Sequence, residues 1–134
     1  MKPQTASEAI ATLSDRSRST LDREAAIHFL YEHSSPEAIK ALARTLHDDD
    51  FGVRWAAAKG LAHAGDAALV PILQEIISHG SDRDLREAAH HALSQNVSPQ
   101  VRAETQDLQK AMKGPSADLA TPEAAFKLLK KVTR

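Results

Sequence analysis

The chain has 134 residues, of which 42% are hydrophobic and 26% charged, and its formal net charge is −1 at pH 7. This length and balance favour one folded unit or a short repeat array and argue against a disordered chain. Alanine and leucine, the strongest helix formers, dominate the hydrophobic fraction, whereas β-branched and aromatic residues are scarce. The composition therefore predicts an all-α protein and excludes β-sandwiches, barrels and parallel-sheet enzymes.

The chain lacks the features of secreted and membrane proteins. It has no cysteine, so it forms neither a disulfide nor a thiolate zinc site. No apolar run approaches the roughly 20 residues of a membrane span, and residues 1–19 lack the apolar core of a signal peptide. We therefore expect a cytoplasmic protein without a membrane partner.

Charge is distributed unevenly along the chain. Residues 110–134 carry six positive and two negative side chains, so the rest of the chain is net negative. This basic end on an acidic body predicts an electrostatic contact, either within the chain or with another molecule. The overall charge near zero makes a general nucleic-acid binder an unfavourable interpretation.

The predicted elements begin with a short helix over residues 7–14, and three similar units follow it. The units span about residues 15–47, 48–80 and 81–112. Because they repeat one pattern, the first helix is interpreted as the cap of an array spanning residues 1–112.

The repeated pattern is Arg-x-Ala-Ala followed by a leucine seven residues after the arginine. The arginines are Arg23, Arg54 and Arg86, and the leucines are Leu30, Leu61 and Leu93. Later in each unit comes a helix-start signal, in which a Ser or Asp side chain accepts from free first-turn amides. These signals are Ser35-Pro36, Asp66 and Ser98-Pro99. Each unit is therefore predicted to be a hairpin of two helices that buries its apolar face only against its neighbours.

The middle unit carries a family resemblance in its runs Val53-Arg54…Ala56-Ala57…Leu61 and Gly65-Asp66…Val70-Pro71…Leu73. These runs resemble HEAT-like repeats of the short bacterial and archaeal type, similar to those of phycobilin lyase subunits. The resemblance covers roughly residues 15–112. It implies a short right-handed α-solenoid of about three hairpins with cap helices at both ends.

The end of the chain departs from the repeat. Residues 113–121 are predicted to be a linker, and residues 122–134 an amphipathic helix with Phe126, Leu129 and Val132 on its apolar side. Two arrangements satisfy this helix equally well. It docks onto its own array, or it exchanges with a second copy to form a homodimer.

No catalytic or cofactor-binding motif is present. The chain has no Gly-x-Ser-x-Gly and no phosphate-binding glycine loop, so we expect a protein that is not an enzyme and has no cofactor. His28 and His91 occupy equivalent places in the first and third units, on the order of 20 Å apart and too far to share an ion. The histidines are therefore interpreted as solvated helix residues, with no metal site. The run Asp48-Asp49-Asp50 is interpreted as a helix cap.

Candidate binding residues come from positions that point away from the predicted core. Trp55 occupies an outward place where the other units have Glu24 and Glu87, and Tyr31 and Phe51 are predicted to join it on the outer face. Exposed aromatic residues make effective binding anchors. Three interpretations remain open for Trp55: contact with a partner, cover by the C-terminal helix, or incidental exposure.

The second helices are predicted to line a groove that grades from basic to acidic. Its first part carries Lys40 and Arg44, its middle Ile72 and Glu75, and its last part Glu104. Such a groove suits a charged, amphipathic peptide. The repeat arginines and Asp66 are predicted to be structural, with the arginines tying neighbouring units together.

These features favour an adaptor that binds another protein or a peptide, because repeat folds mostly act as binding surfaces. Two alternatives remain. The resemblance implies an accessory subunit of a chromophore-lyase system that handles a linear tetrapyrrole. The other alternative is a nucleic-acid-binding solenoid, which would need a basic concave face.

Overall fold

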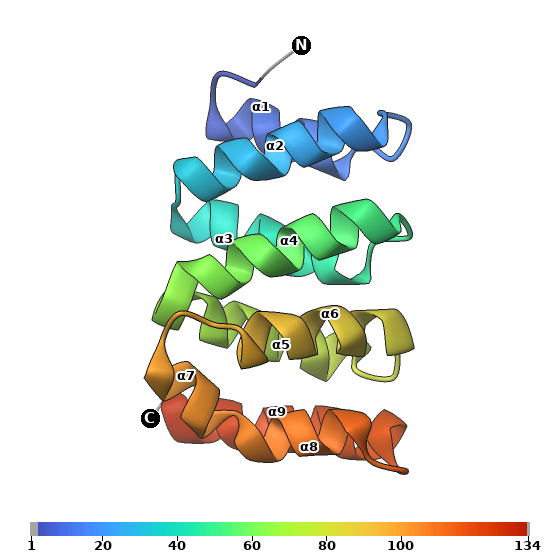
Figure 1. Cartoon of the computed structure of the whole chain (residues 1–134), viewed down its shortest axis with the longest axis vertical. Coiled ribbons are helices and arrows are strands. Elements are labelled where there is room, and N and C mark those ends of the chain that lie inside the picture. Colours follow the sequence, from blue (N-terminus) through green and yellow to red (C-terminus); the bar gives the residue numbers. More distant parts are fainter. Residues whose placement is uncertain (1–2, 134) are drawn as a thin grey trace.

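The computed structural model describes residues 3–133, which form helices stacked in two layers (Figure 1). The front layer in Figure 1 contains α2 (Thr20–Glu32), α4 (Phe51–Ala64), α6 (Arg83–Ser94) and α8 (Gln106–Lys113). The back layer contains α1 (Ala6–Ser14), α3 (Pro36–Arg44), α5 (Leu69–His79) and α9 (Ala117–Val132). The 3₁₀ turns η1 (Thr45–His47) and η2 (Gly65–Ala68) connect the layers, and the short helix α7 (Pro99–Glu104) links α6 to α8. This arrangement confirms the predicted short all-α solenoid.

The core runs along the seam between the layers. The repeated leucines Leu30, Leu61 and Leu93 are buried, and the second alanine of each Arg-x-Ala-Ala motif is completely buried. Burying one leucine contributes about 1.5–3 kcal/mol relative to leaving it exposed. The small alanines let α2, α4 and α6 pack closely side by side along the front layer.

Most predicted helix starts are capped by the expected side chains. Ser35 accepts from the Ala38 amide, Asp50 from the Val53 amide and Ser98 from the Val101 amide. Asp66 is the exception, because α5 begins only at Leu69 and has no side-chain cap. The 3₁₀ turn η2 fills the intervening residues, which leaves the Asp66 carboxylate free to contact another segment.

The third unit differs from the predicted hairpin. Its expected second helix is interrupted at Thr105, which is fully buried and whose hydroxyl donates to the Val101 carbonyl at 2.7 Å. After this break α8 lies in the front layer beside α6, and α9 takes the back-layer place against α5. The predicted acidic end of the second-helix groove is therefore wrong, because the back layer ends in α9 with its lysines.

Helix α9 begins at Ala117, so the predicted linker is reduced to a short turn after Lys113. Pro122 lies inside this helix and removes one backbone hydrogen bond. Close packing accompanies this irregularity: a Cβ atom added to Gly80 would lie 2.9 Å from Cγ of Pro122. The end of α5 and the start of α9 therefore approach as closely as a glycine allows.

Candidate functional site

Side chains from three front-layer helices form an aromatic face, which we define as Tyr31, Phe51, Trp55, His63 and His91. The Tyr31 and His63 rings stack with their centroids 5.2 Å apart. The Trp55 ring meets Phe51 edge-on at 5.9 Å and His91 edge-on at 4.7 Å. Edge-to-face contacts of this kind stabilise aromatic pairs beyond the area that they bury. These ring contacts therefore hold the side chains of the aromatic face in a defined arrangement.

The aromatic side chains differ in exposure. Phe51 is 58% exposed and Tyr31 is 42% exposed, whereas Trp55 is half-buried against the core. The interpretation in which the C-terminal helix covers Trp55 is wrong, because α9 lies in the back layer on α5 and α8. Tyr31 and Phe51 are thus the more exposed aromatic side chains, near an anchored tryptophan.

A groove of about 490 Å³ lies on the surface where α2 packs against α4 within this face. Its floor is apolar, with Ile27, Ala56 and Gly60 between the aromatic residues. Its rim carries two charged side chains. Glu24 on α2 lies close to Gly52 at the start of α4, and Lys59 lies about two turns further along α4. Lys59 makes no ion pair with any residue in the range 3–133. The groove is therefore acidic at one end and basic at the other.

Two neighbouring histidines of α6, His90 and His91, have lowered pKa values, which favours their neutral form. Burial lowers the pKa of His91, and the positive charge of Lys59 lowers it further. The pKa of His90 is lowered by burial and by the charges of Lys113 and His91. At neutral pH the His91 ring is thus an uncharged partner for Trp55.

The second-helix groove predicted from the sequence is not formed as expected. Lys40 and Arg44 are exposed on α3, but Ile72 is completely buried. Glu75 is only 19% exposed at its side chain and lies 3.1 Å from Nε2 of His47. Glu75, predicted to face outward in the middle of this groove, is instead engaged by a histidine of the preceding unit.

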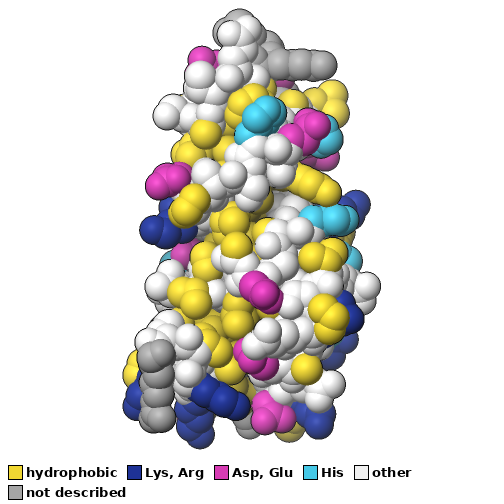
Figure 2. All heavy atoms as spheres, turned by 90° about the vertical axis from the view of Figure 1, so that its left-hand side faces the viewer, with side chains coloured by type: hydrophobic (Ala, Val, Ile, Leu, Met, Phe, Trp, Pro, Cys, Tyr) yellow, Lys and Arg dark blue, Asp and Glu magenta, His cyan; other side chains and the backbone are white. Residues whose placement is uncertain are grey.

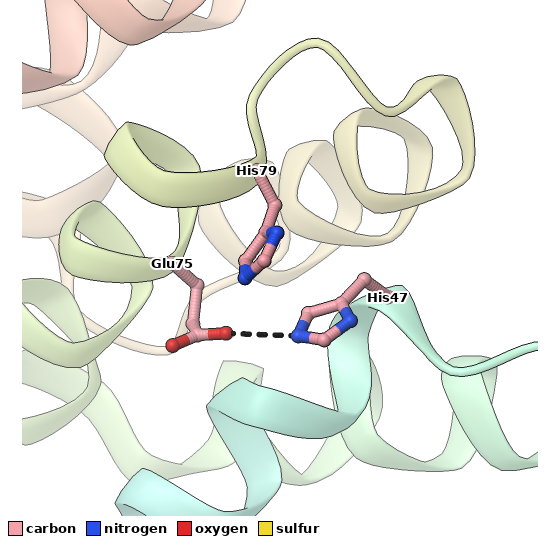
Figure 3. A group of neighbouring side chains, drawn as sticks. All are labelled: His47, Glu75 and His79. Carbon is pink, nitrogen blue, oxygen red and sulfur yellow. Dashed lines mark hydrogen bonds and ion pairs between the residues drawn. The ribbon is translucent and has the colours of Figure 1, made fainter.

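The structure brings together three residues that the sequence analysis did not connect: His47, Glu75 and His79 (Figure 3). One possible ligand atom from each lies within 4.8 Å of those of the other two. The sequence contains a signal for the two histidines of this cluster, because His47 and His79 have the same spacing as the repeat arginines Arg54 and Arg86. Equivalent positions of adjacent units become neighbours on stacking, whereas the comparison of His28 with His91 skipped one unit.

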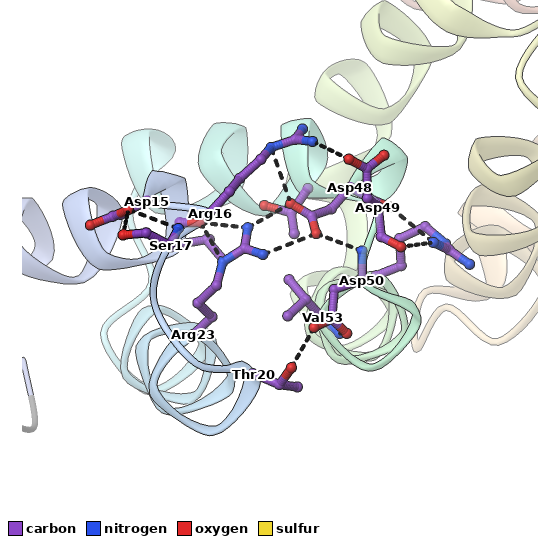
Figure 4. Close-up of polar contacts among 12 residues, drawn as sticks. Asp15, Arg16, Ser17, Thr20, Arg23, Asp48, Asp49, Asp50 and Val53 are labelled. Atoms are coloured by element: carbon purple, nitrogen blue, oxygen red, sulfur yellow. Dashed lines mark hydrogen bonds and ion pairs between the residues drawn. The ribbon is translucent and has the colours of Figure 1, made fainter.

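The repeat arginine of the first unit forms a buried ion pair (Figure 4). Arg23 and Asp48 are 4% and 5% exposed, and two guanidinium nitrogens donate to the carboxylate at 2.5 and 3.1 Å. Arg23 also donates twice to the Leu13 carbonyl. Burial acts to raise the pKa of Asp48, but hydrogen bonds from Arg23 and the Asp50 amide, with the charges of Arg23 and Arg16, hold it below its ordinary value.

The other repeat arginines also contact both a loop and the following unit. Arg54 donates to the Asp48 carbonyl and lies 3.9 Å from the Asp84 carboxylate. Arg86 donates to the Gly80 carbonyl and pairs with Asp118 at 2.8 Å. Between the turns at the opposite ends of these helices, Asp66 accepts from the Ser98 hydroxyl at 2.5 Å.

The surface view in Figure 2 shows Lys and Arg side chains gathered at the lower end of the stack, where Figure 1 places α8 and α9. This is the basic end that the charge distribution predicts. Among the helices of residues 3–133, none is both long and apolar enough to cross a membrane.

Comparison with known proteins agrees with this architecture. Searches of curated proteins and of solved structures found no match. A family model described as HEAT repeats matches residues 6–94, from the first helix to the last residue of α6. The match stops where the array departs from the regular hairpin. With two thirds of its length matched by this model, the chain belongs to the HEAT repeat family.

Proposed function

We propose that this protein is a non-enzymatic adaptor that binds an amphipathic helix of a partner protein across its aromatic face. HEAT repeats generally act as protein-interaction scaffolds. The observation that carries the proposal is the exposure of Tyr31 and Phe51 near the anchored Trp55, together with a groove that Tyr31 and Trp55 line and that α9 leaves uncovered. Aromatic residues held in place contribute much contact area at little entropic cost.

The rim charges specify the chemistry of the bound helix and its direction. Glu24 lies at one end of the groove and Lys59 at the other. The matching helix presents an apolar stripe to the floor, with a basic residue opposite Glu24 and an acidic residue opposite Lys59. Complementary charges of this kind fix the register and orientation of a bound segment more than they raise its affinity.

Selection of helical peptides from a displayed library on the full chain tests the proposal. We expect the selected peptides to share an apolar stripe with this charge arrangement and to change the fluorescence of Trp55. Tyr31→Ala and Phe51→Ala are expected to weaken binding about tenfold or more each. Lys40→Ala and Arg44→Ala in the back layer serve as controls and are expected to bind normally. Peptides that lose affinity only with the back-layer variants would place the binding surface on the second helices instead.

Two other ligand classes serve as comparison probes. A linear tetrapyrrole tests a role related to chromophore lyases, and we expect its absorbance to stay unchanged on mixing. Duplex DNA tests nucleic-acid binding, and we expect no retention that falls steeply with salt. A spectral shift of the tetrapyrrole, or salt-dependent retention of DNA, would favour that class over a protein partner.

A further inference from the structure

The cluster of His47, Glu75 and His79 joins two consecutive units of the back layer (Figure 3). His47 ends the 3₁₀ turn η1, while Glu75 and His79 lie one helical turn apart on the same face of α5. Nε2 of His47 is 3.1 Å from Oε1 of Glu75, and the two imidazole centroids are 4.2 Å apart. Three side chains with metal-ligand chemistry therefore converge from two elements, η1 and α5.

We propose that His47, Glu75 and His79 form a binding site for a divalent transition-metal ion of the Zn²⁺ class. Two imidazoles and one carboxylate form a ligand set that suits zinc and its first-row neighbours rather than Mg²⁺ or Ca²⁺. This proposal does not depend on the aromatic face, which lies on the front layer.

The geometry requires only side-chain adjustment to hold such an ion. Ligand atoms at about 2.0–2.2 Å from a tetrahedral zinc ion are roughly 3.3 Å apart. The three candidate atoms already lie within 4.8 Å of one another, with His47 and Glu75 at 3.1 Å. His79 is exposed at the end of α5, so its side chain has room to change rotamer toward the other two ligands.

The surroundings leave one coordination position open. The next carboxylates along the chain are both engaged: Asp48 by Arg23, and Asp49 by Arg16 at 2.6 Å. They are therefore not available as further ligands. The site supplies three protein ligands and leaves the fourth position to water or to a group from a partner molecule.

An isolated helical His–Glu pair elsewhere in the chain shows what the cluster adds. His28 and Glu32 lie 2.9 Å apart on α2, but both side chains are more than half exposed. Within residues 3–133, His47, Glu75 and His79 are the one group of three potential ligands. An ion bound there would link the end of the first unit to the second helix of the next and stabilise the stacked array.

Titration calorimetry of the metal-free, untagged full chain with Zn²⁺ tests the site. We expect saturable binding of one ion per chain, a rise in the midpoint of thermal unfolding, and no comparable effect of Mg²⁺. Co²⁺ as a spectroscopic probe is expected to give the intense visible bands of a low-coordinate site rather than the weak bands of the hexaaqua ion. Absence of saturable binding of one Zn²⁺ per chain would overturn the proposal.

Variants distinguish this site from adventitious binding by other histidines. His79→Gln and Glu75→Gln each remove a ligand, and Glu75→Gln keeps the side-chain volume and an oxygen that accepts from His47. We expect each to weaken Zn²⁺ binding about tenfold or more while the helical circular dichroism stays unchanged. The control, His28→Gln, is expected to bind as the wild type does. Equal affinity in the wild type and both cluster variants would assign the ion to another place and refute the proposal.

Discussion

At the scale of single residues, the repeat arginines contribute differently to the stability of the fold because their surroundings differ. Arg23 is enclosed with Asp48, whereas the Asp84 and Asp118 partners of Arg54 and Arg86 keep more than half of their side chains exposed. A buried charged group that loses its partner stays uncompensated in the interior. An exposed charged group that loses its partner is solvated by water instead. The same sequence motif therefore contributes unequally along the array.

This difference predicts a large contrast between two adjacent aspartates. Asp48→Ala is expected to lower the free energy of unfolding by about 3–5 kcal/mol, because it leaves the buried Arg23 guanidinium without its partner. Asp49→Ala breaks only the contact with Arg16, in which the Asp49 side chain is 89% exposed, and should cost less than about 1 kcal/mol. Urea unfolding of both variants measures the contrast. Equal destabilisation of the two variants would show that the buried Arg23–Asp48 pair contributes no more to stability than the exposed Arg16–Asp49 pair.

The lowered pKa of His91 predicts a loss of stability in weak acid. Its ordinary pKa is about 6.5, and the unfolded chain therefore takes up a proton below that pH while the folded chain resists it. The contribution of neutral His91 to stability is thus present above pH 6.5 and is lost as the pH falls through its lowered folded-state pKa. Urea unfolding of the wild type and His91→Gln between pH 7.5 and about 5 is expected to show a flatter profile for the variant. Substitution of the exposed His28 by Gln provides the control, and an unchanged slope in His91→Gln would contradict the assignment.

Sequence reasoning identified single residues better than it identified their neighbours. The outward position of Trp55 follows from helical periodicity, but its half-burial depends on Phe51 and His91, one of which belongs to another unit. Likewise, Glu75 was placed on a surface, but its engagement by His47 is a contact between units. Periodicity gives the direction of a side chain from its own helix, and contacts between helices decide what that side chain meets.

At the scale of elements, α9 is the part of the fold that the repeat pattern did not place. The pattern assigned the last back-layer position to residues 99–112, but the buried Thr105 interrupts that segment and its apolar stripe is thin. Helix α9 offers a better surface to α5, with Ala125 completely buried at their interface and Leu128 and Leu129 packed on the core. The more apolar helix occupies the position, although it lies further along the chain.

Close packing at the end of α5 predicts that glycine is required there. Gly80→Ala places its Cβ 2.4 Å from the Ile76 carbonyl oxygen and 2.9 Å from Pro122, so one of the helices must shift. Overpacking of this kind typically costs about 1–3 kcal/mol. The matched control is Gly114→Ala, whose Cβ has no atom nearer than 3.5 Å and whose stability should be unchanged or slightly higher. Thermal unfolding of both variants provides the measurement, and equal midpoints would show that α9 does not pack tightly on Gly80.

At the scale of the whole molecule, the two ends of the stack differ. Helix α1 pairs with α2 at one end, and α8 and α9 form the last pair at the other. The last pair leaves Leu119 80% exposed and Phe126 52% exposed on α9, and a groove of about 470 Å³ lies between the two helices on another face of α9. Among residues 3–133 no other helix packs over these two side chains, so α9 exposes apolar surface of the kind that stacking buries elsewhere in the array.

This exposed end predicts concentration-dependent pairing of two copies through α9. The α8–α9 groove is lined by both Glu104 and Lys131, so a two-fold arrangement can set opposite charges against each other. Sedimentation of the full chain is expected to show the mass rising from 14.5 kDa toward twice that value with concentration. Phe126→Glu should keep the chain monomeric, whereas Leu21→Glu, at a 79% exposed position near the other end, should not. A mass of one chain at every concentration, or equal loss of pairing in both variants, would show that this end stays free. The α9 surface would then be available to a partner other than a second copy of the chain.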